Sequence, residues 1–407
     1  MNADVVVIGG GPSGMAAALE ASKTGADTIL IERDDRLGGI LNQCIHNGFG
    51  IHYFGEELTG PEYAYKFIRE IKKSNIKVML SSFVTKIKSN MVEVVSPSGA
   101  VSINAKSIVL SMGCREKTAG AIKLTGSRPS GVFTAGQVQK MVNIYGKLPC
   151  KKPIILGSGD IGLIMARRMT YEGAKPVMVL EIMKQTAGLA RNITQCLEDY
   201  HIPLFTSTTI VDIVGENKVE GVIIAKVDDK LNIIDSTKKF VKCDGVILSV
   251  GLIPENDLAR GIKMNPKTNG AIVNEYHETS MKNVFACGNV LHVHDLVDFV
   301  TKESELTGRF AGLNATVGLK RGKSYIVNAG DGVRYTIPNS IYKGDEEVTI
   351  LFRVNHKFVK SNIFVSCGNE VIKKKFVISA NAGEMQEITL DKSLINGDIT
   401  VSMGGEK

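Results

Sequence analysis

Two short glycine-rich motifs are the residues of this chain best suited to binding a reactive cofactor. In each motif the first glycine permits a tight turn, the second lets a pyrophosphate approach the backbone, and the third lets a helix pack closely on a strand. The helix that follows offers free N–H groups and a partial positive charge to phosphate oxygens. The spacing predicts two dinucleotide sites, whose expected contacts are Gly9, Gly11, Pro12, Ser13 and Gly14 in the first motif, and Gly157, Ser158, Gly159, Asp160, Ile161 and Gly162 in the second.

An acidic residue completes each motif. Glu32 and Glu181 each follow their motif by about 20 residues, where such an acid accepts a hydrogen bond from the ribose 2′-hydroxyl. Arg33 directly follows Glu32 and is expected beside the same nucleotide, whereas no arginine stands next to Glu181 to hold a 2′-phosphate. A single glycine motif could be an ordinary loop, but two complete motifs argue against that alternative. We therefore predict NAD(H) rather than NADP(H) at the second site.

The elements that must position these motifs follow from the apolar pattern around them. Each motif is preceded by a continuous apolar run, which is typical of a strand buried on both faces, and is followed by a helix and a second strand. The repeated βαβ unit indicates an internal duplication of fold. The first unit is expected to have strand 4–8, helix 15–24 and strand 28–32; the second is expected to have strand 153–156, a helix that follows its motif and ends at about residue 172, and strand 176–181. Short alternating runs at 84–88, 91–96, 101–104 and 107–111 predict a β-meander, and a helix is expected over 296–313.

Composition and charge exclude several other kinds of protein. The 407 residues are 43% hydrophobic and 22% charged, and the net charge of +7 is scattered along the chain. The basic run 373–375 is typical of a solvated strand face rather than a nucleic-acid or lipid patch. Seven widely separated cysteines exclude CxxC pairs, zinc knuckles and iron–sulfur spacings, so we expect no metal. With no signal segment or spanning segment expected, the prediction is a cytoplasmic protein without membrane insertion or nucleic-acid binding.

The arrangement of motifs resembles the two-dinucleotide-binding-domain flavoproteins of the pyridine nucleotide-disulfide oxidoreductase superfamily, over residues 1 to about 320. The resemblance implies that the first unit binds FAD, with Glu32 at its ribose, and that the second binds NAD(H). The family usually has Asp where this chain has Asn289, which can still hydrogen-bond the ribityl hydroxyls but brings no charge. The further family marks add Gly38, Gly39, Met112, Gly113, Gly251, Gly288 and Asn289 to the expected cofactor-binding residues.

The same resemblance sets the expected domain organisation. The predicted fold class is α/β, with two Rossmann-like three-layer domains and a small C-terminal β-sandwich-like domain. The NAD domain is inserted in the FAD domain, with crossings near Cys114 and Pro254. The expected domains are an FAD-binding domain of residues 1–115 and 255–322, an NAD-binding domain of residues 116–254, and an all-β domain of residues 323–407.

Cysteine usage separates this chain from the disulfide reductases of the superfamily. Those enzymes carry a cysteine pair after the Leu-Gly-Gly turn or inside the nicotinamide domain, whereas here Cys44 stands alone after the turn. Dithiol exchange requires a second thiol, so we do not expect a dithiol-type disulfide reductase. Cys44 could still cycle through a sulfenic acid if His46 lowers its pKa, as in peroxide-reducing relatives. The alternative is a buried cysteine that packs near the flavin.

Two further histidines are candidate catalytic residues. His292 and His294 precede the last helix of the FAD domain, whose N-terminus points at the pyrimidine edge of the flavin in the resembling folds. One of them could stabilise the reduced flavin anion or relay a proton. The alternative is that Asp295 caps the helix and both histidines lie on the surface. His46 is a weaker candidate for the same role.

Three functions remain open from the sequence. The stretches 42–63, 126–133 and 297–300 resemble bacterial FAD/NAD oxidoreductases that are encoded beside an FAD-dependent glycerol-3-phosphate dehydrogenase. That resemblance implies electron transfer between NAD(H), FAD and a partner flavoprotein or other electron-transfer subunit, with an oligomer possible. The second function is an NADH oxidase or peroxidase that uses Cys44. The third is an assembly subunit whose nucleotides are structural, with the β-domain as a docking module.

Overall fold

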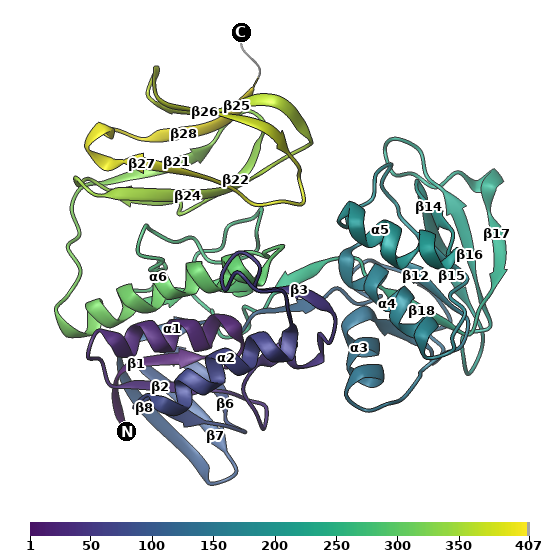
Figure 1. Ribbon diagram of the computed structural model, residues 1–407, viewed down its shortest axis with the longest axis horizontal. Helices are drawn as coiled ribbons and strands as arrows, with labels where there is room; N and C mark the ends of the chain where they lie inside the picture. Colours follow the sequence, from purple (N-terminus) through teal and green to yellow (C-terminus); the bar gives the residue numbers. More distant parts are fainter. Residues whose placement is uncertain (405–407) are drawn as a thin grey trace. The chain divides into compact units, whose positions relative to one another are not determined.

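The computed structural model describes residues 1–404, and their contacts divide the chain into two compact units. One unit comprises Met1–Cys114 together with Pro254 onward, and the other comprises Arg115–Ile253 (Figure 1). The second unit is therefore inserted in the first, and each has helices and a sheet of its own; the sheet of the first unit is mixed, and the five-stranded sheet of the second is parallel. The predicted α/β fold class with two Rossmann-like domains is confirmed.

The first unit is built on a seven-stranded sheet in the order β5-β2-β1-β8-β7-β6, with β20 paired to β8. Its central strand is buried on both faces because Val5 and Val7 pack on the helical side while Val6 and Ile8 pack on the other. The strands are β1 (Asn2–Ile8), β2 (Thr28–Ile31), β5 (Lys77–Met79), β6 (Phe83–Lys88), β7 (Met91–Ser96), β8 (Gly99–Leu110) and β20 (Val284–Ala286), with a short pair β3 (Asn47–Phe49) and β4 (Leu58–Thr59) outside the sheet.

One long strand, β8, replaces two strands expected from the sequence. The separate segments 101–104 and 107–111 are continuous in the structure. The first half of β8 pairs antiparallel with β7, and the second half pairs parallel with β1. The pattern changes along the strand from alternating burial to full burial, because only the second half is covered on both faces. In the sequence, such a change of burial within one strand looks the same as a break between two strands.

Helices α1 and α6 pack side by side although they are far apart in the sequence (Figure 1). Small residues allow this close approach: a methyl group on Gly308 of α6 would lie 2.1 Å from the carbonyl oxygen of Ala17 in α1. The helical segments of this unit are α1 (Pro12–Lys23), η1 (Gly39–Gln43), α2 (Gly60–Lys73), η4 (Gly288–Val290) and α6 (Val297–Thr316).

The second unit repeats the parallel arrangement on a smaller scale. Its five-stranded parallel sheet has the order β11-β18-β12-β13-β14, and a four-stranded sheet, β10-β15-β16-β17, accompanies it. The elements from Cys114 to Pro254, the first and last of which cross the boundary of the unit, are β9 (Cys114–Glu116), β10 (Thr125–Gly126), β11 (Val132–Thr134), α3 (Ala135–Asn143), β12 (Pro153–Leu156), α4 (Asp160–Tyr171), β13 (Met178–Leu180), α5 (Ala190–Cys196), η2 (Glu198–Tyr200), β14 (Leu204–Phe205), β15 (Thr208–Val214), β16 (Gly221–Lys226), η3 (Asp235–Thr237), β17 (Lys239–Lys242), β18 (Gly245–Leu248) and β19 (Leu252–Pro254).

The C-terminal strands form two sheets that enclose a core of their own, as the β-sandwich prediction requires. A buried ion pair between Lys392 and Glu275, with 3.0 Å between nitrogen and oxygen, joins the sandwich to the rest of the first unit. Its elements are β21 (Ser324–Ala329), β22 (Val333–Ile337), β23 (Ser340–Tyr342), β24 (Glu347–Val354), β25 (Phe358–Cys367), β26 (Glu370–Ala380), β27 (Gln386–Asp391), η5 (Lys392–Leu394) and β28 (Ile399–Gly404).

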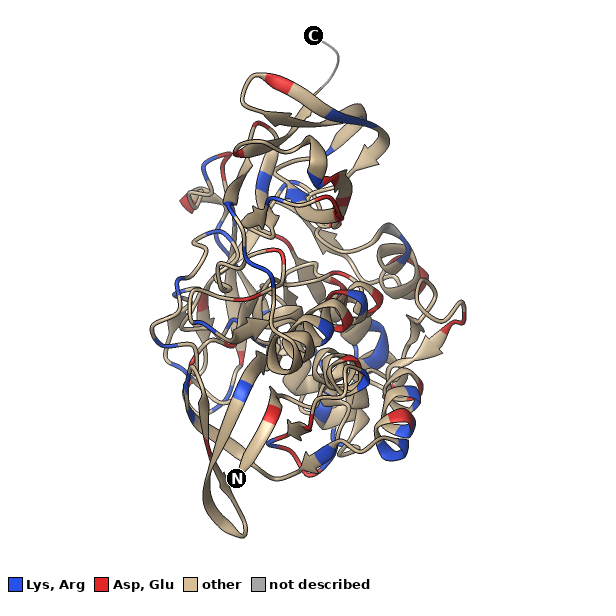
Figure 2. Ribbon diagram, turned by 90° about the vertical axis from the view of Figure 1, so that its left-hand side faces the viewer, with Lys and Arg blue, Asp and Glu red and all other residues tan. Residues whose placement is uncertain are grey.

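Charged residues are distributed over both units. Lysine and arginine are interspersed with aspartate and glutamate over the ribbon (Figure 2). The basic run 373–375 lies in β26 and is exposed, as expected for a solvated strand face. Within residues 1–404 no helix has both the length and the apolar character needed to cross a bilayer.

Candidate functional site

The first glycine motif follows β1 and opens α1, as the spacing predicts. Gly9 has φ +107°, and a methyl group there would lie 2.5 Å from the carbonyl oxygen of Ser111. A methyl group on Gly14 would lie 1.7 Å from the carbonyl oxygen of Gly9. By contrast, no protein atom lies within 4 Å of the corresponding position on Gly11, which is the N-cap of α1. Two glycines are therefore required by the fold, and the third leaves space where a pyrophosphate would approach.

Glu32 lies at the end of β2 with its carboxylate against this motif. The side chain is buried, Oε2 accepts a 2.6 Å hydrogen bond from the Gly10 amide, and Oε1 accepts one of 2.8 Å from the Asp34 amide. These donors fix the position of the carboxylate at the edge of the motif, where a ribose hydroxyl is expected. Arg33 is exposed beside it.

Three further segments of the first unit meet around the same motif. The Gly38 amide donates to the Gly10 carbonyl oxygen at 2.9 Å, and a methyl group on Gly39 would lie 3.0 Å from the Gly11 Cα. The Ser13 hydroxyl lies 2.7 Å from the Ser304 hydroxyl and 3.2 Å from the Cys287 carbonyl oxygen. Segments predicted separately thus form one site, which also includes Met112, Gly113, Gly288 and Asn289 at the carboxyl ends of β8 and β20.

The second motif has the same geometry within its own unit. Gly157 has φ +99°, and a methyl group there would lie 2.2 Å from the carbonyl oxygen of Ser249. A methyl group on Gly162 would lie 2.7 Å from the Ser249 Cβ, and one on Gly159 would lie 3.3 Å from the Ser249 Oγ. Gly251, two residues after Ser249, has φ +101°. The loop after β18 therefore covers the second motif as the loop after β8 covers the first.

Glu181 and Asp160 organise the surroundings of the second motif. Glu181 is buried, and its Oε2 accepts hydrogen bonds from the Ser158 amide at 3.0 Å and the Ser158 hydroxyl at 2.6 Å. Asp160, the first residue of α4, accepts from the Leu189 amide at 2.9 Å and from the Asn192 side chain at 2.7 Å. Asp160 therefore attaches the segment after β13 to the start of α4.

The structure places Cys44 and His46 away from the buried core of the first unit. Cys44 is half-buried, and its Sγ donates to the Ile40 carbonyl oxygen at 3.3 Å. His46 has Nδ1 3.0 Å from the Asn47 carbonyl oxygen, and its ring contacts Phe49. Across residues 1–404 the cysteines, Cys44 among them, are thiols that form no disulfide.

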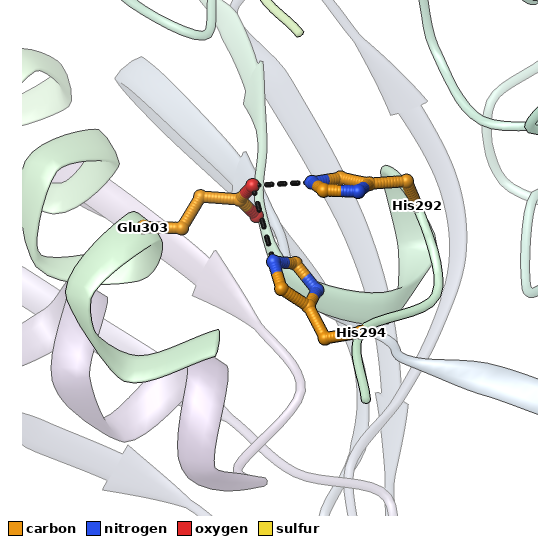
Figure 3. A group of neighbouring side chains, drawn as sticks. All are labelled: His292, His294 and Glu303. Carbon is orange, nitrogen blue, oxygen red and sulfur yellow. Dashed lines mark hydrogen bonds and ion pairs between the residues drawn. The ribbon is translucent and has the colours of Figure 1, made fainter. Parts of the chain in front are cut away.

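His292, His294 and Glu303 form a buried cluster (Figure 3), and the Gly288 amide donates a hydrogen bond to Glu303 at 2.7 Å. Glu303 Oε2 lies 2.6 Å from His292 Nε2 and 3.4 Å from His294 Nε2. Burial lowers the pKa of His292 to about 4, although Glu303 opposes the shift. Burial alone would raise the pKa of Glu303, but His292 and His294 outweigh it and hold that pKa well below its usual range. Contact with the two histidines therefore favours the ionised form of the Glu303 carboxylate.

The alternative interpretation of this segment, with surface histidines and Asp295 as the helix cap, is wrong. His292 has no exposed surface and His294 retains 8%. The N-cap of α6 is Leu296, without a side-chain cap hydrogen bond. Asp295 instead lies 3.5 Å from Arg353 of the sandwich. The sandwich covers this loop, and the sequence pattern near residue 295 gives no sign of that cover.

Sequence reasoning missed Glu303, Tyr335 and Arg353. Tyr335 Oη lies 3.4 Å from His292 Nδ1, and Arg353 donates to the Val293 carbonyl oxygen at 2.9 Å. A usable signal was present for Glu303 alone, because it shares the buried face of α6 with Val300 and lies one turn before Thr307. A glutamate at such a position needs a polar partner.

The chain belongs to the pyridine nucleotide-disulphide oxidoreductase family, whose model matches residues 3–307. It is 26% identical over 309 residues to an "NAD(P)H coenzyme A polysulfide/persulfide reductase" of Pyrococcus horikoshii, a match that covers 73% of this chain and 64% of that protein. It is 22% identical to an opine oxidase subunit from Agrobacterium tumefaciens, over 78% of this chain and 66% of that protein. The chain thus spans about two thirds of the length of these relatives.

A solved structure shows the same fold over the whole chain. The NAD-dependent persulfide reductase from A. fulgidus aligns with a TM-score of 0.59 and 21% identity, covering 100% of this chain and 74% of that one. The family binds FAD and NAD(P)H, and the expected cofactor classes are thereby confirmed. The open position at Gly11 and the two buried acids fit such cofactors.

Proposed function

We propose that this chain is an FAD-dependent NAD(H) oxidoreductase, with FAD on the first unit and NAD(H) on the inserted unit. The observation that carries the proposal is the repeated geometry of the two motifs: each has glycines that the fold requires and an acid at the end of the next strand. When bound, FAD and NAD(H) supply the hydride-transfer chemistry. The protein supplies position and electrostatics.

Each binding role follows from the geometry of the chain. The N-terminus of α1 and the open side of Gly11 receive the FAD pyrophosphate, and Glu32 accepts a hydrogen bond from the ribose. In the inserted unit the N-terminus of α4 and Glu181 have the same roles toward NAD(H). Asn289 orients the ribityl chain, since its side-chain oxygen is already fixed by a 2.9 Å hydrogen bond from the backbone amide of His294.

An anaerobic titration tests the proposal. The purified chain should show an oxidised-flavin absorption band, which NADH bleaches at a much lower concentration than NADPH does. The preference follows from Glu181, whose carboxylate accepts a ribose hydroxyl and repels a 2′-phosphate. A bound flavin that neither nucleotide reduces would contradict the electron-transfer function and favour the assembly role with structural nucleotides.

We further propose that electrons pass between the flavin and a partner protein, of the type of an FAD-dependent glycerol-3-phosphate dehydrogenase. Support comes from the resemblance of stretches 42–63, 126–133 and 297–300, and from similarity to a protein named as a subunit of opine oxidase. Co-purification with such a dehydrogenase and substrate-dependent reduction of NAD⁺ by the pair would support it. Unchanged rates on mixing would contradict it.

Cys44 supports a second candidate, an oxidase, peroxidase or persulfide reductase that uses a single thiol. The thiol is half-buried, and one relative is named as a persulfide reductase. The Cys44→Ser variant separates the two functions because serine cannot form a sulfenic acid or persulfide. Loss of nearly all turnover with peroxide or persulfide would favour the second candidate, whereas undiminished reduction of an artificial dye by NADH favours the first.

A further inference from the structure

Three metal-ligating side chains meet inside the first unit. The ligand atoms of His292, His294 and Glu303 all lie within 4.8 Å of one another, and all three residues are buried (Figure 3). In a tetrahedral site with metal–ligand distances of 2.0–2.1 Å, ligand atoms are about 3.3 Å apart. The 3.4 Å between His294 Nε2 and Glu303 Oε2 already has this value, and the 2.6 Å to His292 Nε2 would have to lengthen by about 0.7 Å.

His294 gives an independent reason to expect a ligand. Both of its ring nitrogens are buried, and neither makes a hydrogen bond. Nε2 has only the 3.4 Å ion-pair contact with Glu303 Oε2. A buried polar atom without a partner is unfavourable and rare in folded proteins. A flavin bound at the first motif would touch atoms that the protein leaves accessible, and these nitrogens are not accessible. The missing partner is therefore a small group inside the cluster.

Neighbouring groups hold the three side chains in a ligating arrangement. The second carboxylate oxygen of Glu303 accepts from the Gly288 amide at 2.7 Å, which leaves Oε2 directed at the histidines. His292 has its other nitrogen 3.4 Å from Tyr335 Oη, on the sandwich. Arg353 fixes the backbone between the two histidines through the Val293 carbonyl oxygen. Outer partners of this kind orient the ligands in metal sites.

We propose that His292, His294 and Glu303 form a binding site for one divalent transition-metal ion, zinc or ferrous iron. Two imidazole nitrogens and one carboxylate oxygen are the donor set that both ions accept, and three protein ligands leave one position for water. The ion replaces the direct contact between His292 and Glu303 and supplies the partner that His294 lacks. The sequence alone disfavours a metal role for His292 and His294, because it gives no sign of the glutamate that α6 brings to the histidine pair.

Metal analysis of the full-length flavoprotein tests this site without reference to turnover. The chelator-treated protein is dialysed anaerobically against zinc or ferrous ions, and metal per chain is measured by mass spectrometry. We expect one ion per wild-type chain and at least tenfold weaker binding for His294→Gln and Glu303→Gln. The His356→Gln variant is the matched control, because His356 is exposed and outside the cluster, and it should bind as the wild type does. The tighter of the two ions identifies the metal.

Cobalt(II) provides a second measurement that does not depend on the variants being folded. Added to the stripped wild-type protein, it should give visible absorption bands of a four-coordinate nitrogen and oxygen site, which zinc abolishes in a one-to-one titration. Flavin content and circular dichroism establish whether each variant is folded. Absence of stoichiometric metal from the wild type, or equal binding by folded His294→Gln and Glu303→Gln variants, would overturn the proposal.

Discussion

The two βαβ units use one geometric scheme but hold their motifs differently. In the first unit no protein atom lies near the side-chain position of Gly11, and Ser13 fixes the start of α1 through its contact with Ser304 of α6. In the inserted unit Gly159 has the Ser249 hydroxyl nearby, and the start of α4 is fixed by Asp160 through a surface segment. The first motif is therefore attached to the long helix α6, and the second to the start of the short helix α5. A tightly held cofactor suits the first arrangement, and an exchanging nucleotide suits the second.

The largest expected effect comes from the glycines of the first unit. Gly11→Ala should leave folding intact, because no protein atom opposes the new methyl group, yet weaken FAD binding at least tenfold, or about 1.4 kcal/mol. Gly14→Ala should instead destabilise the unit by about 1–3 kcal/mol, since its methyl group meets the Gly9 carbonyl oxygen. Flavin-to-protein ratio and thermal unfolding distinguish the two variants. Full flavin content in the Gly11→Ala variant would contradict the assigned position of the pyrophosphate.

The two acids should separate the two nucleotides. Glu181→Gln replaces the carboxylate that accepts from the Ser158 amide and hydroxyl with a neutral amide. NADH should therefore bind about 10-fold more weakly, or by about 1.4 kcal/mol, while flavin content is unchanged. Glu32→Gln should lower flavin content and leave NADH affinity of the remaining holoprotein unchanged. Fluorescence titration with NADH and absorbance of released flavin measure both. Reversal of the two effects would mean that the cofactors are assigned to the wrong units.

A smaller effect is expected at Asp160. Asp160→Ala removes the acceptor of two hydrogen bonds and an acidic group at the start of α4, which should cost about 1–2 kcal/mol of local stability. Protection of residues 187–192 from hydrogen exchange should fall, while that of α1 stays the same. Equal loss of protection in both units would contradict the separate attachment of the two motifs.

The smallest effect concerns the buried thiols of both units. Burial raises the pKa of Cys150 and of Cys287 to about 12, and that of Cys243 to about 11. At pH 8 these groups remain neutral thiols, and only above their raised pKa values does the reactive thiolate prevail. Brief alkylation at pH 8 followed by mass spectrometry should modify the half-buried Cys44, Cys114 and Cys367 first. Early labelling of Cys287 would indicate that the first unit opens locally.

The fold class was predictable because the sequence patterns that specify it are local. Apolar runs such as 4–8 and glycine positions such as Gly14 depend on neighbours in the same βαβ unit, and the confirmed fold reflects this. The groups that surround the Glu303 cluster, Tyr335 and Arg353, were not predictable, because they depend on how the sandwich packs over the loop before α6. Contacts of that kind come from residues far away along the chain, such as Tyr335, which is 43 positions from His292.

Insertion of one unit within the other has a consequence for synthesis on the ribosome. The inserted unit has all its strands once residue 254 has emerged, whereas the first unit still lacks β20 and α6. The edge of β8 that β20 later covers, and the face of α1 that α6 later covers, stay unpaired in the nascent chain during that interval. Domains generally fold as units during translation. The inserted unit can therefore complete its fold first. The first unit then folds with Cys114 and Pro254 already attached to the two ends of the folded inserted unit.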